Sequence, residues 1–111
     1  MAYDEELADR IRALLADEPG VSEQRMFGGL AVLIGGNMAV AASGQGGLMV
    51  RVDPAQSEEL VAGGVARPMV MRGREMAGWL RAEADAVQTR DHLARWVRLG
   101  VEYARSLPPK R

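Results

Sequence analysis

The strongest constraint on the fold is a series of short apolar runs with period two, separated by glycine-rich turns. Residues 21–34 form an extended run that ends in Leu-Ala-Val-Leu-Ile, which is apolar on both faces and therefore typical of a central strand. Residues 35–37, Gly-Gly-Asn, tolerate the positive φ angles of a tight hairpin, and the alternation resumes over 38–42. It returns over 48–53 after the turn at 44–47. We therefore predict an antiparallel meander of three strands.

Three other segments carry the signals of helices. Residues 3–16 place apolar side chains at helical spacing among charged ones. Residues 53–54, Asp-Pro, are a typical N-cap and first helical position, and the glycines at 63–64 would end that helix. Thr89 can cap a last helix with an apolar stripe, which would end at the prolines 108–109. The chain thus begins and ends with an amphipathic helix.

A second hairpin is expected near the end of the sheet. Residues 67–71 and 75–81 read as extended segments joined by a turn at 72–74. Pro68 cannot donate to a strand ladder, which favours an edge position. The order helix, three strands, helix, two strands, helix predicts a two-layer α+β domain. We expect a single domain over 1–111, with an antiparallel sheet of about five strands and helices mainly on one face.

Composition excludes several classes of protein. The 111 residues suffice for one core, and 48% hydrophobic with 26% charged residues is an ordinary globular composition. There is no cysteine, so disulfides and thiolate chemistry are impossible. The sequence has neither a signal-peptide pattern nor a long apolar run, so we expect a cytoplasmic protein that does not contact membranes.

No motif for catalysis, a metal or a cofactor is found. His92 is the only histidine, and its place near the start of the last helix suggests exposure to solvent. None of the four serines lies in a Gly-x-Ser-x-Gly turn. The loop at 44–47 lacks the lysine and hydroxyl residue of a phosphate-binding loop and precedes a strand. We therefore expect no catalytic residue, no metal ligand and no cofactor.

Four segments resemble a known family. Residues 25–31 read Arg-Met-Phe-Gly-Gly-Leu-Ala, and the segments 48–54, 71–79 and 103–110 support the same match in the same order. The sequence resembles the TfoX/Sxy N-terminal domain family, named after regulators of natural competence in which a C-terminal domain follows. Because the sequence ends at Arg111, we expect a stand-alone domain. The resemblance implies the fold, and it transfers no catalytic residue.

The candidate interaction surface combines strand glycines, arginines and exposed apolar side chains. Arginines flank Trp79 in the second hairpin, and methionines there would face away from the helices. The predicted surface comprises Phe27, Gly28, Gly29, Arg51, Arg67, Met69, Met71, Arg72, Arg74 and Trp79.

Three functions are open for this surface. The leading hypothesis is a non-enzymatic interaction or regulatory module that binds a protein partner or a second copy of itself, as a homodimer. One alternative is nucleic-acid binding by the arginine-rich hairpin around Trp79. Another is a small-ligand binder or enzyme with a pocket near residues 27–29, where glycines allow a close approach.

Overall fold

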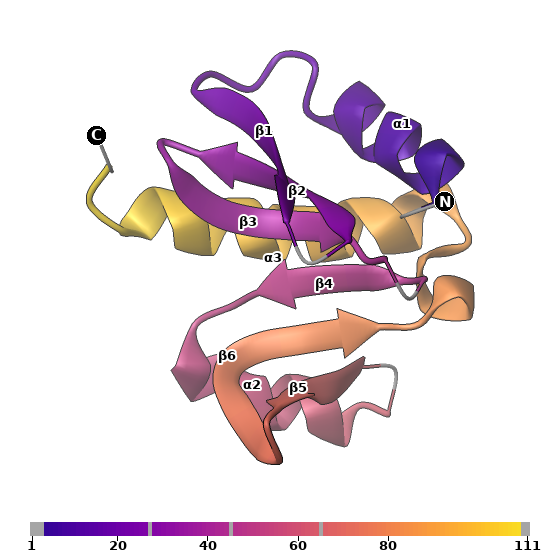
Figure 1. The fold of residues 1–111 in the computed structure, drawn as a ribbon, viewed down its shortest axis with the longest axis vertical. Helices are drawn as coiled ribbons and strands as arrows, with labels where there is room; N and C mark the ends of the chain where they lie inside the picture. The colour runs from indigo at the N-terminus through magenta and orange to yellow at the C-terminus, as the bar shows by residue number, and fades with distance from the viewer. Residues whose placement is uncertain (1–3, 27, 45, 65, 110–111) are drawn as a thin grey trace.

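In the computed structural model, helices cover one face of a single antiparallel sheet (Figure 1). The structure describes residues 4–26, 28–44, 46–64 and 66–109. Within these ranges the chain forms three α-helices, six strands and one short 3-10 helix. Their order is α1 Glu5–Leu14, β1 Val21–Met26, β2 Gly29–Ile34, β3 Asn37–Ala42, β4 Leu48–Arg51, α2 Pro54–Ala62, β5 Ala66–Met71, β6 Arg74–Ala82, η1 Ala84–Val87 and α3 Arg90–Ser106.

The six strands form one antiparallel sheet in the order β1-β2-β3-β4-β6-β5. The first four strands follow chain order as a meander, and α2 interrupts the sheet before the β5–β6 hairpin joins β4 through β6. Pro68 lies in β5, an edge strand, as predicted. Strand β6 curves strongly along its length (Figure 1). Gly78 within this strand has a φ of 81°, which glycine adopts without a steric penalty. The outer half of the hairpin therefore turns away from the main sheet.

All three helices pack on the same face of the sheet. Figure 1 shows α3 running across β3 and β4, with α1 beside it and α2 behind β5 and β6. The inward residues of α1 and α3 join those of the strands in one core. Its largest fully buried side chains are Ile11, Leu48, Leu80, Leu93, Val40, Val50, Val52 and Val87. The α+β class and the one-sided placement of the helices are therefore confirmed.

The number of strands differs from the prediction of about five. The extended run 21–34 forms two strands, because Gly28 adopts a φ of 74° and the chain reverses between β1 and β2. Strand β1 lies at the edge of the sheet, and Ser22, Glu23, Gln24 and Arg25 are exposed there. An edge strand with polar residues on both faces has weak hydrophobic alternation, so the sequence pattern did not predict β1 as a separate strand.

The predicted helix starts are confirmed by their hydrogen bonds. The Asp53 carboxylate accepts from the backbone N–H of Ala55 at 2.9 Å, with Pro54 as the first residue of α2. Thr89 Oγ1 accepts from the N–H of His92 at 3.1 Å and caps α3. Asp4 caps α1 in the same way. The segment 82–88, predicted as a connection, contains the short helix η1.

Two glycines allow backbones to approach closely. A Cβ at Gly29 would lie 2.4 Å from the carbonyl oxygen of Ala42, so the close approach predicted for the strand glycines is present at this position. A Cβ at Gly100, in the middle of α3, would lie 2.4 Å from the carbonyl oxygen of Ala39 in β3. Gly100 thus fixes how near α3 lies to the sheet.

Gly100→Ala tests this contact because two effects oppose each other. Alanine favours a helix over glycine by about 1 kcal/mol, so helix propensity alone predicts stabilisation. The clash with the backbone of β3 predicts a net loss of about 1–3 kcal/mol, as for overpacked cores. Urea unfolding of the variant should show the loss, whereas Glu102→Ala, at an exposed α3 position, should change stability by less than about 0.5 kcal/mol. A more stable Gly100→Ala protein would contradict the close packing of α3.

Candidate interaction face and cleft

The face of the sheet that lacks helices carries a second apolar cluster. Ala31 pairs with Ala41, and Ala41 pairs with Met49, so these three side chains share one face. With Met38 they form a cluster in which no residue exceeds 8% exposure. Four half-buried side chains surround it, namely Met26, Leu33, Met69 and Trp79. No helical residue within the described ranges belongs to this cluster. We call these eight residues the helix-free face.

The structure brings part of the predicted surface to this face. Met69 and Trp79 border the apolar cluster, and Arg51 pairs with Trp79 across β4 and β6. Arg67 pairs with Arg81 in the neighbouring strands β5 and β6. Four residues of the predicted surface thus lie together, although they come from three strands.

The other predicted residues lie apart or outside the description. Arg72 and Arg74 are exposed at the tip of the β5–β6 hairpin. Gly28 is exposed, and nothing lies within 4 Å of the place where its Cβ would stand. Phe27 lies outside the described residues, as does the side chain of Met71. A pocket near residues 27–29 therefore stays a prediction.

Arg51 lies over two aromatic rings at one end of the helix-free face. Its guanidinium carbon is 5.3 Å from the centroid of the Trp79 ring and 5.4 Å from that of Tyr103 in α3. The ladder between β3 and β4 ends at the pair Val40–Val50, one residue before Arg51. The cation therefore connects a strand to α3 through contacts that are worth about 0.5–2 kcal/mol each.

Glu83 organises the arginines at the other end of this face. Its carboxylate pairs with Arg67 and lies 3.4 Å from the Nε atom of Arg81. Arg81 also donates to the Ser43 hydroxyl at 3.1 Å and to the carbonyl oxygen of Gly46 at 2.6 Å. The hydrogen bond from Arg67, with the charge of both arginines, holds the pKa of Glu83 below its ordinary value. This single carboxylate therefore offsets one of the two positive charges.

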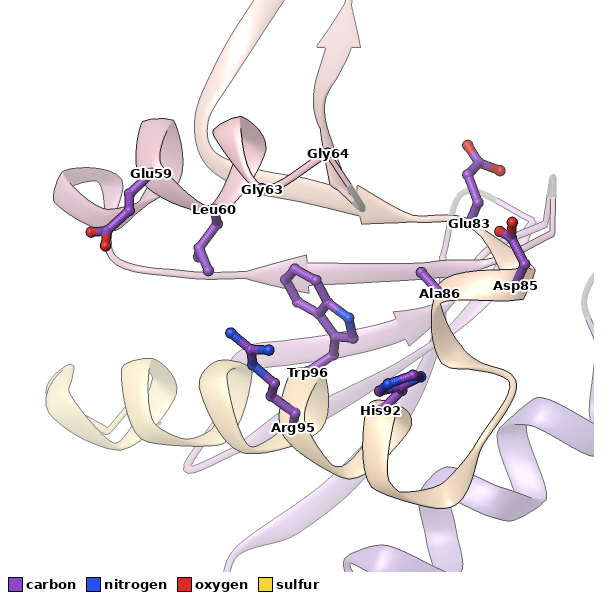
Figure 2. A pocket seen from close by; sticks show the side chains of 10 residues that line it. All are labelled: Glu59, Leu60, Gly63, Gly64, Glu83, Asp85, Ala86, His92, Arg95 and Trp96. Atoms are coloured by element: carbon purple, nitrogen blue, oxygen red, sulfur yellow. The ribbon is translucent and has the colours of Figure 1, made fainter.

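A cleft of about 640 Å³ lies on the helix side of the sheet, between α2, η1 and α3 (Figure 2). Leu60, Ala86 and Trp96 supply its apolar surface, while Gly63 and Gly64 line the end of α2. The polar residues that line it are Glu59, Glu83, Asp85, His92 and Arg95. The size suits a small molecule.

Donors and acceptors occupy different walls of this cleft. His92, Arg95 and Trp96 all come from α3, whereas the carboxylates come from α2 and η1 or the residue before it. His92 is exposed on the first turn of α3, as the sequence suggested. Within the described ranges, no group of three or more carboxylate or imidazole residues is arranged to hold a metal ion.

Sequence reasoning missed Glu83 and the cleft. Trp96 was placed correctly in the apolar stripe of the last helix, but it also lines a cleft together with Leu60, Gly63 and Gly64, which are far from it in the sequence. Glu83 lies in a segment that was read as a connection, and Ser43 is 38 residues from Arg81. No local pattern links such residues, so only the folded sheet reveals the network.

The helix-free face and the cleft both lie within one family domain. A family model described as the TfoX N-terminal domain matches residues 13–104, which include every strand and all residues that line the cleft. The chain belongs to the TfoX N-terminal domain family. No curated protein matches the sequence. Within the described part of this TfoX N-terminal domain, no helix is long and apolar enough to cross a membrane.

Glu83→Gln tests the arginine network through the pH dependence of stability. Since the folded protein holds the pKa of Glu83 low, its carboxylate stabilises the fold above about pH 4.3, the ordinary glutamate pKa, and this contribution is lost as the pH falls further. We expect Glu83→Gln to be less stable than the unmodified domain at pH 7, with the difference narrowing by about pH 3. Urea midpoints at both pH values measure this.

The matched control is Glu102→Gln. This exposed α3 carboxylate has no ion pair among the residues that the structure describes, so its replacement should leave the pH profile unchanged. A Glu83→Gln profile parallel to that of the unmodified domain would show that Glu83 does not stabilise the fold through its charge.

Proposed function

We propose that this domain is a non-enzymatic interaction module that binds a second copy of itself through the helix-free face. The observation that supports the proposal most directly is the apolar cluster around Ala31 and Ala41, which no described helix covers. Sheets with one packed face usually expose polar residues on the other. The centre of this face is buried within the chain, so a partner would contact mainly its half-buried border of Met26, Leu33, Met69 and Trp79. An accessible apolar border of this kind is typical of a surface that a partner covers.

The composition of the face favours protein binding. Its centre is formed by small alanines and its border by Met26, Leu33, Met69 and Trp79, all half-buried. Methionine adapts its shape to a partner at low cost, and tryptophan and methionine are enriched in the cores of protein interfaces. The face therefore has the apolar centre that a stable contact needs.

The distribution of charge favours a second copy as the occupant. Ser22 and Gln24 of β1 pair with Leu33 and Ala31, so they share the helix-free side, while the arginines lie at the opposite end of the sheet. A twofold axis through the central alanines would place the arginine end of one copy against the uncharged side of β1, formed by Ser22 and Gln24, in the other. Isologous pairing of this kind matches apolar to apolar and avoids repulsion between like charges.

Nucleic-acid binding receives less support from the same residues. Arg67 and Arg81 are paired with Glu83, which reduces the positive charge of the hairpin surface. Arg51 is stacked on aromatic rings, and Arg72 and Arg74 project from the hairpin tip. A bent, partly neutralised surface is a poor track for a phosphate backbone. We place the module in the cytoplasm, in keeping with the absence of cysteine.

Leu33→Asp tests self-association. A charge on the border of the helix-free face would have to be desolvated in the dimer, so we expect the dissociation constant of the dimer to rise at least about 100-fold. Light scattering coupled to size exclusion, over protein concentrations from about 1 μM to 1 mM, measures the mass of each variant. Val70→Asp is the matched control, since Val70 is 61% exposed and lies outside this face.

The fold of each variant is checked by its thermal melting curve, because Leu33 is half-buried. As a test without substitution, methyl labelling of methionine should show signals of Met26, Met38 and Met49 that shift on dilution. The proposal would be overturned if the unmodified domain stays monomeric at about 1 mM and its methyl signals do not depend on concentration.

A further inference from the structure

Trp96 presents a hydrogen-bond donor to the cleft between α2 and α3. Trp96 is only 5% exposed, yet among the described residues no buried side-chain polar atom lacks a hydrogen-bond partner, so its indole N–H opens to the solvent in the cleft. Figure 2 shows the indole nitrogen on the edge of the ring that faces Ala86 and His92. Tryptophan commonly combines an apolar ring with an N–H that faces water. A ligand with a hydrogen-bond acceptor would replace water at this group.

The charges around Trp96 are separated across the cleft. In Figure 2 the Arg95 guanidinium lies on one side of the indole ring and the Asp85 carboxylate on the other. Neither side chain forms an ion pair among the described residues, whereas Glu83 is already held by Arg67. The cleft therefore offers one free positive and one free negative group with an apolar surface between them.

The end of α2 adds to the negative side. The helix ends at Gly63 without a basic residue in its last turn, so the partial negative charge of its terminal carbonyls is not offset. Glu59 lies one turn earlier and also lines the cleft. A positively charged group is therefore favoured near α2 and η1, and a negatively charged group near α3.

We infer that this cleft binds a short peptide with free termini, of two or three residues, that carries an apolar side chain. The terminal carboxylate would pair with Arg95, the ammonium group with Asp85, and a peptide carbonyl would accept from the Trp96 N–H. Leu60 and Ala86 would contact the apolar side chain. Two or three extended residues span about 7–11 Å, and a cleft of about 640 Å³ accommodates a molecule of this size. The inference is independent of self-association, because the cleft lies on the helix side of the sheet.

The indole N–H signals of the two tryptophans provide a direct readout by nuclear magnetic resonance. Titration with leucyl-leucine should shift the Trp96 signal in a saturable way and leave the Trp79 signal in place, with the assignment confirmed by Trp79→Phe. N-acetyl-leucyl-leucinamide, which lacks both charges, should bind at least about tenfold more weakly. Free leucine distinguishes a site for peptides from one for single amino acids, and equal or tighter binding of leucine would overturn the peptide assignment.

Substitutions of Arg95 and Asp85 test which charged residue of the cleft binds which end of the peptide. Arg95→Gln and Asp85→Asn should each raise the Kd for leucyl-leucine about tenfold or more, because each removes one charge-assisted hydrogen bond. Arg98→Gln is the matched control, since this exposed arginine lies on α3 but does not line the cleft. Trp96→Phe keeps most of the buried volume and should weaken binding several-fold.

Two results would overturn the inference. One is an unchanged Trp96 signal with leucyl-leucine at about 10 mM, well above the affinity of a useful site. The other is equal binding by the free and the blocked peptide, since the site would then not read the charged termini. Because the mass of the protein in solution is measured separately, neither result bears on the proposed self-association.

Discussion

The contact between Gly100 of α3 and Ala39 of β3 determines how the two layers of this domain fit together. A residue with a Cβ at Gly100 would collide with the strand, so glycine allows the helix to lie directly on the backbone of the sheet. Ala39 is the extra residue where the pairing of β2 and β3 shifts register. The close approach brings Leu93 and Val97 of α3 into the core. It also sets the position of Trp96, which forms the wall of the cleft.

Much of the fold could be predicted from the sequence because its elements obey local rules. The caps at Asp53 and Thr89, the glycine turn at 35–37 and the edge position of Pro68 each follow from backbone chemistry within a few residues. Strand β1 was missed for a physical reason. It is held by its ladder with β2 and by the pairing of Glu23 with Arg12, which also lowers the pKa of that carboxyl, rather than by hydrophobic alternation.

The site was predictable only where residue type already implied exposure and adaptability. Met69 and Trp79 were selected because apolar and guanidinium groups in one hairpin suggest a surface, and the sheet places both on one face, next to Arg51 of β4. The Arg51 contact with Tyr103 joins positions far apart in the sequence and has no local signal. The place of Trp96 in the cleft is equally invisible, because it depends on where α2 and η1 end relative to α3.

Glu83 connects the two surfaces. It lines the cleft on the helix side, while its carboxylate holds Arg67 and Arg81 at the end of the sheet that borders the helix-free face. Because Arg67 and Arg81 already hold this carboxylate, the ammonium group of the proposed peptide pairs with Asp85 instead. Glu83 thus borders both surfaces, while peptide binding and self-association use different residues on opposite sides of the sheet.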